Sequence, residues 1–217
     1  MPSPIHIPGI AIHANAEVIH VHSSEPLTTV STSFFGGGFR RVSHILNASV
    51  AKDYCSNTPA ADLKSIAARN GVSAPFVGLM TAVPLRKSRF VMLEAADLRA
   101  EVLVTAGVGN ATSAGITPPC GPKAGTINII VLLDARLSRP AMLNAIITVT
   151  EAKSAVLTEM GIRTADGAAA TGTSTDTVTV AMTGRGATLS YAGPATVLGW
   201  LIAKTVRQAV RESLMAQ

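Results

Sequence analysis

The sequence predicts a single α+β domain spanning residues 1–217, in which a mainly antiparallel sheet packs against two long helices. Three observations support this fold class. Short apolar runs of strand length recur along the chain, and two long segments with helix start signals lie in its second half. No repeat or low-complexity linker divides the 217 residues. Hydrophobic residues make up 47% of the chain and charged residues only 14%, which is enough to bury a large core.

The first half of the chain is expected to form short strands with two helices among them. Strands are predicted at 10–12 and 17–22, and a turn-rich stretch at 31–38 precedes a short helix at 40–48. A second helix is predicted at 59–70, because Pro59 suits a first turn and Gly71 suits a stop. Three further strands are predicted at 76–82, 90–94 and 100–105.

The second half is expected to hold the most buried strand and both long helices. After a loop at 107–124, the near-continuous apolar run 126–133 is typical of a strand buried on both faces. Ser138 is a good N-cap for a helix that stops at Gly161. A strand at 177–182 and a short strand at 188–191 precede the last helix, which Pro194 opens and which ends near Leu214.

Composition narrows the classes of function. The net charge is +5, but the basic residues are scattered and no basic stripe is interleaved with aromatic residues, so we expect no nucleic-acid binding. No apolar run approaches the roughly 18–20 residues of a membrane span, and no signal peptide is recognisable. We therefore predict a cytoplasmic protein with Cys55 and Cys120 as reduced thiols, whose surplus apolarity leaves room for a homo-oligomer interface.

The densest polar cluster is the segment 170–176, between the predicted long helix and the strand at 177–182. Its hydrogen-bonding side chains, together with one glycine, place many donors and acceptors in a small volume. The residues are Thr171, Gly172, Thr173, Ser174, Thr175 and Asp176. Such a loop suits a polar ligand held close to the backbone, or a reaction with a developing oxyanion. The structural alternative is a turn whose hydroxyl groups satisfy their own backbone.

A second polar cluster follows the strand predicted at 100–105. Thr105 ends that strand, Gly107 and Gly109 let the backbone approach a ligand, and Asn110 offers both a donor and an acceptor. Neither of the common phosphate-binding glycine patterns is present, so a phosphate loop is not indicated. The alternative is an ordinary glycine-rich turn.

Two further candidate sites involve carboxylates. Asp134 ends the buried strand and is either paired, with Arg136 as the candidate, or functional. On the following helix Asn144, Thr148 and Glu151 fall at i, i+4 and i+7, which places them on one face of an otherwise apolar segment. That stripe is expected to face a pocket, and its alternative is a solvated surface.

The histidines suggest a metal site only weakly. All five lie in the first 44 residues: His6, His13, His20, His22 and His44. His20 and His22 share one face of a predicted strand, as two metal ligands can. No third ligand follows at a recognisable spacing, so no metal is predicted.

A series of collinear blocks runs along the chain: Phe35-Gly36-Gly37-Gly38 with Ile45-Leu46-Asn47, and then residues 77–82, 104–111, 125–130, 133–138, 144–148, 150–153 and 170–176. In this order the blocks resemble the adenosylcobinamide amidohydrolase family of corrinoid salvage enzymes. The resemblance runs from about residue 30 to 214, and neither cysteine belongs to the matching blocks.

The resemblance implies hydrolysis of an amide. The family removes the aminopropanol arm of adenosylcobinamide, which gives adenosylcobyric acid and 1-amino-2-propanol. The cobalt belongs to the corrinoid substrate, and no cofactor of the protein's own is implied. The amide-rimmed corrin ring suits the polar clusters, and the expected substrate-binding residues are Asn47, Thr105, Gly107, Gly109, Asp134, Asn144, Thr148, Thr171, Gly172, Thr173, Ser174 and Thr175.

The mechanism has two forms at this point. In the first, water attacks the amide, Glu151 or Asp176 is the general base, and the Asn110 amide or the backbone N–H groups of 172–174 hold the oxyanion. In the second, a threonine or serine of the 171–175 loop is the nucleophile and forms an acyl-enzyme. A different class of function, a non-catalytic corrinoid carrier or sensor, would use the same pocket without consuming its ligand.

Overall fold

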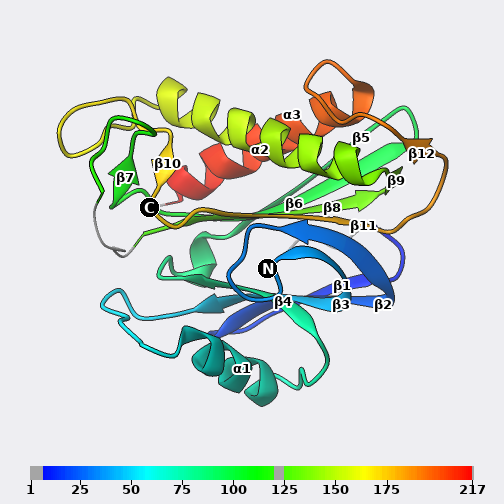
Figure 1. Ribbon diagram of the computed structural model, residues 1–217, viewed down its shortest axis with the longest axis horizontal. Coiled ribbons are helices and arrows are strands. Elements are labelled where there is room, and N and C mark those ends of the chain that lie inside the picture. The colour runs from blue at the N-terminus through cyan, green and yellow to red at the C-terminus, as the bar shows by residue number, and fades with distance from the viewer. Residues whose placement is uncertain (1–6, 120–124, 217) are drawn as a thin grey trace.

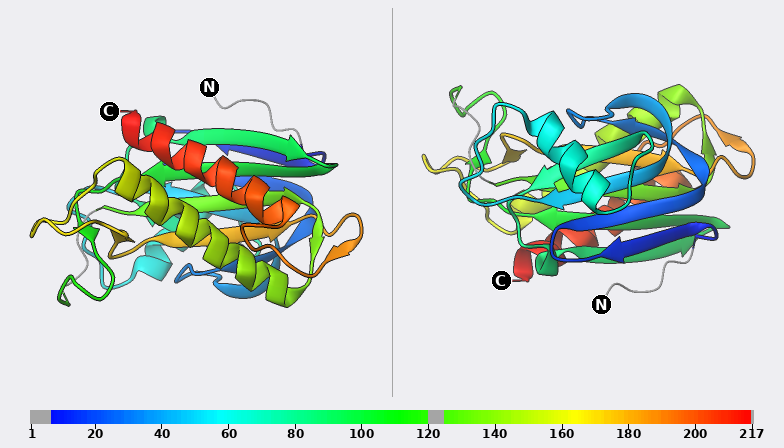
Figure 2. Two further views of the ribbon diagram at one scale, coloured as in Figure 1. Left: turned by 90° about the horizontal axis from the view of Figure 1, so that it is seen from above. Right: turned by 90° about the horizontal axis from the view of Figure 1, so that it is seen from below.

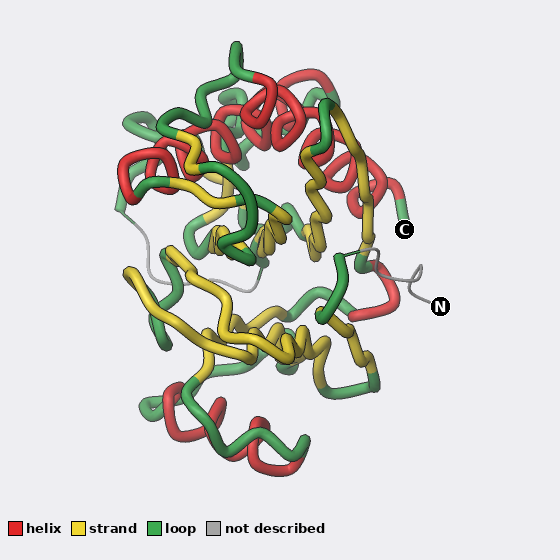
Figure 3. The backbone as a smooth tube through the Cα atoms, turned by 90° about the vertical axis from the view of Figure 1, so that its right-hand side faces the viewer, coloured by secondary structure: helices red, strands yellow, loops and turns green. Residues whose placement is uncertain are grey.

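Two layers of strands lie between helices in the computed structural model, which describes residues 7–119 and 125–216 (Figure 1). Helices α2 (Arg139–Glu159) and α3 (Val197–Met215) cover one strand layer, and helix α1 (Pro59–Arg69) covers part of the other. Viewed from the side, the order is helices, strands, strands, helix (Figure 3). The described residues therefore form one α+β domain. Three helices pack on its sheet, whereas the sequence predicts a sheet packed against two long helices.

The main sheet is mixed, which corrects the expectation of a mainly antiparallel one. Its order is β4-β3-β2-β11-β8-β6-β5, with β1 paired to β2. The pairs β3/β4 and β8/β11 are parallel, and the others are antiparallel. The bounds are β1 (Ile10–Ala14), β2 (Val18–Ser31), β3 (Gly38–Ser49), β4 (Phe76–Thr81), β5 (Arg89–Ala95), β6 (Leu98–Ala106), β8 (Ile127–Asp134) and β11 (Thr177–Met182).

Short elements complete the fold and tie loops together. The two-residue strands β7 (Ala111–Thr112) and β10 (Gly172–Thr173) pair with each other, as do β9 (Arg136–Leu137) and β12 (Thr188–Leu189). A single 3₁₀ turn, η1 (Leu85–Lys87), precedes β5. The β7/β10 pair brings together two loops that lie about 60 residues apart in the sequence.

Strand β2 belongs to both layers. A register shift between His22 and Leu27 divides it, as a β-bulge does when it bends a strand. Its first part pairs with β1 and with the end of β3, whereas residues 28–31 pair with β11. The two layers are therefore one continuous sheet that folds over itself.

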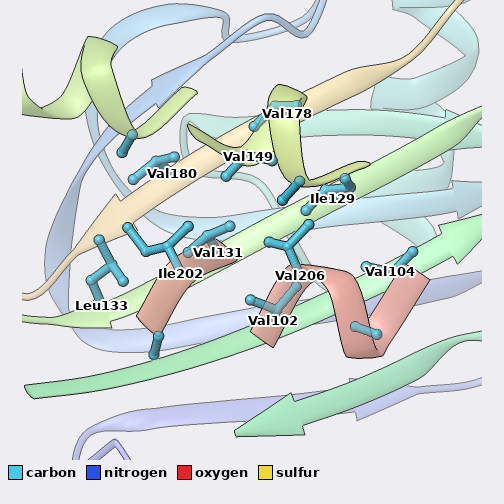
Figure 4. Close-up of a cluster of buried hydrophobic side chains, with 14 of the residues drawn as sticks. Val102, Val104, Ile129, Val131, Leu133, Val149, Val178, Val180, Ile202 and Val206 are labelled. Atoms are coloured by element: carbon cyan, nitrogen blue, oxygen red, sulfur yellow. The ribbon is translucent and has the colours of Figure 1, made fainter. Parts of the chain in front are cut away.

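Three apolar clusters fill the spaces between the layers. The largest packs α2 and α3 on their strands, where Val149, Ile202 and Val206 meet Ile129 and Val131 (Figure 4). A second cluster lies between the two strand layers, and a third lies under α1. Strand β8 contributes alternate side chains to the first and second clusters, so the predicted burial of both faces is confirmed. Burial of this kind contributes roughly 25 cal/mol per Å² of apolar surface.

Two local predictions need correction. Residues 40–48 lie in strand β3, not in a helix. The second part of β3 lies under α1 on one face and under the other strand layer on its opposite face, so both faces are apolar and the period of two is lost. The last helix begins at Val197 rather than at Pro194, because the Thr196 hydroxyl caps it by accepting from Gly199 N at 3.0 Å.

The long-helix start signals are otherwise confirmed. Ser138 caps α2 by accepting from Ala141 N at 3.2 Å, and Pro59 stands in the first turn of α1. Helices α2 and α3 run side by side across the strands beneath them (Figure 2). None of the helices in the described part of the chain has the length and apolarity that crossing a bilayer requires.

Candidate functional site

The predicted polar loops meet at one end of the sandwich, where the Asp176 carboxylate accepts four hydrogen bonds. Its Oδ1 accepts hydrogen bonds from Ile127 N at 3.0 Å and from the Thr173 hydroxyl at 2.5 Å. Its Oδ2 accepts from Thr173 N at 3.1 Å and from Lys153 Nζ at 2.5 Å. These four donors hold the carboxylate in one orientation between the start of β8 and the 171–175 loop.

Lys153 is the functional candidate that the sequence analysis missed. Its side chain is only 8% exposed and that of Asp176 is 13% exposed, so their ion pair is largely withdrawn from water. Gly172 makes room for this pair, because a Cβ there would lie 2.4 Å from Asp176 Oδ2 and 2.7 Å from Lys153 Nζ. The available signal was a lysine among the buried positions 149, 152, 153, 156 and 157 of α2, where an unpaired charge is costly.

Asn110 connects the two predicted loops. Its Nδ2 donates to Gly125 O at 2.9 Å and to the Ser174 hydroxyl at 3.1 Å. Thr175 Oγ1 donates to the same Gly125 carbonyl at 3.0 Å. Position 125 has to be glycine, because φ is +133° and a Cβ would lie 2.1 Å from Asn110 Oδ1. The structure thus places Asn110 beside the Thr/Ser loop.

A buried chain of amides and hydroxyls supports this end from below. Asn47 Nδ2 donates to Thr105 Oγ1, and Asn128 Nδ2 donates to Asn47 Oδ1, both at 2.9 Å. Asn47, Thr105 and Asn128 are all fully buried. Thr126 Oγ1 connects this hydrogen-bond network to the 171–175 loop by donating to Thr175 O at 2.8 Å. Asn47 and Thr105 therefore join the strand layers and support the loop from beneath.

Thr171 and Gly107 each form a hydrogen bond that ties one of the two loops to a neighbouring segment. Thr171 Oγ1 accepts from Ala114 N at 2.9 Å, and Gly107 N donates to Thr126 O at 3.0 Å. A Cβ on Gly107 would lie 2.6 Å from Val83 Cγ2, so the backbone approaches the Val83 side chain closely there. Both residues lie within the cluster, in positions that hold the loops against each other.

Two cavities are lined by residues near the polar end. One of 510 Å³ is bounded by the predicted residues Gly109, Asn110 and Ser174, and also by Arg163 and Asp166. The other, of 830 Å³, lies beside Ala82 and Pro84 and carries three basic side chains, Lys52, Arg86 and Arg89. Residues of the 105–111 loop line the 510 Å³ cavity, whereas the 830 Å³ cavity is lined by other segments.

Asp134 lies away from this end, at the opposite end of β8. At about 3.3 Å per residue, the seven-residue step from Ile127 places it roughly 23 Å away. Its Oδ1 accepts from the Thr183 hydroxyl at 2.8 Å and from Arg185 at 3.1 Å. Arg136, the partner considered from the sequence, instead donates to Gly184 O.

The predicted stripe on α2 is also separate from the cluster. Asn144 Oδ1 accepts from Ala192 N at 3.1 Å, and the Thr148 hydroxyl donates to Ala192 O at 2.8 Å, so both tie α2 to the segment before α3. Glu151 is exposed. It lies two residues, or about 200° around the helix, from Lys153, which faces Asp176.

Comparisons with known proteins identify a family that matches nearly the whole chain and relatives that match part or most of it. A family model described as adenosylcobinamide amidohydrolase matches residues 4–217. A Methanosarcina mazei protein named adenosylcobinamide amidohydrolase is 32% identical over 194 residues, which cover 85% of this chain and 88% of that protein. A Halobacterium salinarum protein of the same name is 34% identical over 120 residues, covering 52% of this chain and 49% of that one.

Solved structures share the fold at low sequence identity. A Pyrococcus horikoshii protein has a TM-score of 0.51 and 13% identity, with 100% of this chain and 82% of that chain covered. A β-aminopeptidase from a Burkholderia species has a TM-score of 0.50 and 12% identity, with 97% and 85% covered. At such identities the likeness concerns the chain fold alone.

Proposed function

Because the chain belongs to the adenosylcobinamide amidohydrolase family, we propose that the polar end around Asp176 is where it hydrolyses the aminopropanol amide of adenosylcobinamide. The products are adenosylcobyric acid and 1-amino-2-propanol, and the acid returns to cobalamin synthesis. The cobalt enters with the substrate, and we assign no cofactor to the protein itself.

The contact between Thr173 and Asp176 carries the proposal. The half-buried Thr173 hydroxyl donates to the Asp176 carboxylate at 2.5 Å, and the Lys153 ammonium fixes that carboxylate from its other oxygen. A hydroxyl aligned on an oriented carboxylate is the arrangement that general-base activation of a nucleophile needs. This contact favours the acyl-enzyme route over direct attack by water.

In the proposed reaction, Thr173 Oγ1 attacks the amide carbon while its proton passes to Asp176. The C–N bond then breaks, and aminopropanol leaves with that proton. Water hydrolyses the resulting ester, which releases adenosylcobyric acid and restores the Thr173 hydroxyl. Lys153 keeps Asp176 in place through both steps and is a positioning residue.

We assign the carbonyl oxygen of the substrate to the Asn110 amide. Of the donors considered from the sequence, Thr173 N already donates to Asp176, whereas Asn110 Nδ2 lies 3.1 Å from the neighbouring Ser174 hydroxyl. A carbonyl oxygen entering here replaces an acceptor that Asn110 Nδ2 now contacts, such as the Ser174 hydroxyl. Donors placed 2.7–3.1 Å from a developing oxyanion contribute about 10²–10³-fold in rate each.

The two cavities suggest how the substrate lies. We place the aminopropanol arm in the 510 Å³ cavity, because Asn110 and Ser174 border it. The amide-rimmed ring then extends across Gly107 toward the 830 Å³ cavity, where Lys52 and Arg86 can donate to amide carbonyls. Asp134, Asn144 and Thr148, which the sequence analysis included among the substrate-binding residues, lie outside this placement.

Three variants test the assignment with adenosylcobinamide as substrate and mass spectrometry of both products. T173A, D176N and N110A are each expected to lose about 10²-fold or more in kcat. A corrinoid acyl adduct on Thr173, trapped by rapid acid quench, would support the covalent route directly. Normal turnover by T173A together with loss in D176N would instead return the mechanism to attack by water.

The variant E151Q tests whether Glu151, rather than Asp176, is the general base. Because Glu151 is exposed and away from the cluster, E151Q is expected to retain wild-type turnover. A loss of 10²-fold in E151Q, with normal activity in D176N, would overturn the assignment of the base. If the wild-type protein binds adenosylcobinamide but releases neither product, with or without chelator, then the protein is a corrinoid carrier or sensor and not an amidohydrolase. The cytoplasmic location and the homo-oligomer stay predictions.

A further inference from the structure

Four large apolar side chains are exposed on the outer face of helices α2 and α3. Leu143 and Ile147 on α2, and Val197 and Trp200 on α3, each expose between 48% and 54% of their surface. Single exposed apolar residues are ordinary, but several on one face mark an interaction site. We call these four residues the helix patch.

The helical period turns the helix patch away from the core. Ile147 lies two residues, or about 200° around the helix, from Val149, and Trp200 lies equally far from Ile202. Val149 and Ile202 pack on the strands beneath (Figure 4). The other two members of the patch lie one turn before Ile147 and Trp200, and they therefore share the same outward faces.

The two halves of the patch lie at the same end of the helix pair. Near the start of α2, Asn144 accepts from the backbone of Ala192, just before α3. At the end of α2, Glu159 pairs with Arg207 and Arg211 in the second half of α3. The helices therefore run side by side in the same direction, and no other helix or strand of the described residues lies over their outer face (Figure 2).

Charged residues follow the patch, and their sign differs between the two helices. After the first turn of α2, its exposed charged residues are Glu151 and Glu159, whereas those of α3 are Lys204 and Arg211. In the part of the chain that the structure describes, neither Glu151 nor Lys204 forms an ion pair. Lys204 Nζ lies 4.7 Å from the centroid of the Trp200 ring. Glu151 and Lys204 can therefore meet opposite charges on another molecule.

The two helices carry matching patterns on their outer faces. Each has two apolar residues about one turn apart, followed about one turn later by a charged residue. The residues are Leu143, Ile147 and Glu151 on α2, and Val197, Trp200 and Lys204 on α3. A twofold axis parallel to the helices lays α2 of one copy along α3 of a second copy, in the same direction. Apolar residues then meet apolar residues, and Glu151 meets Lys204 of the second copy. The face is therefore complementary to itself.

The area of this face is sufficient for a stable dimer. At about 1.5 Å per residue and about 10 Å per helix, α2 and α3 present a face of about 30 Å by 20 Å, or roughly 600 Å². Two copies face to face would together bury about 1,200 Å², which is the lower limit of ordinary stable interfaces. Tryptophan is among the residues that contribute most binding energy at such interfaces, and Trp200 lies within the patch.

We propose that the outer face of α2 and α3 is the interface of a twofold-symmetric homodimer, in which the helix patch of one copy packs on that of the second copy. The contact does not involve the polar end, because Lys153 reaches Asp176 from the buried face of α2. The inference therefore stands apart from the activity proposed for that end.

Sedimentation velocity of the full-length protein tests this inference, because one chain has a mass of 22.3 kDa and a dimer has twice that mass. At about 100 μM the wild type should sediment as a dimer, with a Kd of about 10 μM or lower. I147E and W200E each place a charge in the interface and should weaken dimerisation at least about 100-fold. I116E, which alters an isoleucine exposed elsewhere, should dimerise as the wild type does.

Charge reversal tests the arrangement of α2 along α3. E151K and K204E should each weaken dimerisation about tenfold, because like charges then face each other across the interface. The double variant E151K/K204E restores opposite charges and should recover most of the affinity.

Three results would overturn the inference. One is a monomeric wild type at about 100 μM, on the order of ten times the expected Kd, which would leave this face free or open to a different protein. Another is unchanged dimerisation in both I147E and W200E, which would mean that the copies meet elsewhere. The third is a double variant E151K/K204E that dimerises no better than the single variants, because α2 then does not lie along α3. Circular dichroism verifies that each variant folds, and the altered side chains are all exposed in the single chain. None of these readouts depends on amide hydrolysis.

Discussion

Replacement of Lys153 by methionine is the most informative perturbation of stability. K153M keeps the aliphatic stem but leaves the Asp176 carboxylate without its ammonium, in a place where the two side chains are 8% and 13% exposed. Breaking a buried pair by removing one partner costs about 3–5 kcal/mol. Since water still reaches part of Asp176, we expect the lower end, about 3 kcal/mol.

For a chain of this length, a loss of about 3 kcal/mol lowers the thermal midpoint by roughly 6–12 °C. Urea unfolding followed by circular dichroism measures the free energy directly. D176N added to K153M should recover part of the loss, because a neutral amide needs no ammonium, and the coupling should exceed about 1 kcal/mol. K204M, which removes an exposed lysine from α3, should cost less than about 1 kcal/mol.

The reasoning fails if K153M unfolds within about 1 kcal/mol of the wild type, or if the effects of K153M and D176N simply add. Either result would mean that the pair is solvated in solution. K153R should restore most of the stability if charge rather than shape is what Asp176 requires.

Three further predictions follow from single contacts. G172A places a methyl group 2.4 Å from Asp176 Oδ2, so kcat should fall at least tenfold, and normal kcat would show that the loop can yield. N128A leaves the buried Asn47 Oδ1 without its donor, and urea unfolding should show a loss of about 2–4 kcal/mol. Between pH 6.5 and about 4 the unfolded chain protonates His20 while the folded chain does not, so stability falls as the pH is lowered. Because His20 is half-exposed, the expected loss is only on the order of 1 kcal/mol, and a urea series at pH 7 and 5 should show that H20Q removes it.

The sequence predicted elements best where the signal is local. Ser138 and Pro59 mark helix starts by satisfying or omitting backbone donors within one turn, and the apolar run of β8 reflects burial on both faces. Strand β3 was mistaken for a helix because its two faces are covered by different partners. The parallel pairs β3/β4 and β8/β11 depend on contacts between distant segments, which no local pattern encodes.

The candidate site was predicted in part for the same reason. The 105–111 and 170–176 segments each showed their polarity locally, and β7/β10 pairing brings them together. The partner of Asp176 could not be read from spacing, because Lys153 lies on a different element and only the packing of α2 aims it at the loop. Likewise Asp134 at the end of β8 pairs with Arg185, which follows the neighbouring strand β11, while Arg136, nearer in sequence, donates to a backbone carbonyl.

The position of β2 in both layers has a consequence for how the chain folds. Val30 of β2 pairs with Val180 of β11, about 150 residues further along. Contacts of such long sequence separation slow folding. The entropy of closing the intervening loop is lost before the paired strands contribute any stabilising free energy. During synthesis the second half of β2 keeps an open edge until residues 177–182 have emerged, and open edges recruit other strands. Products that stop before β11 are therefore expected to aggregate, whereas those that lack only the end of α3 should reach solution.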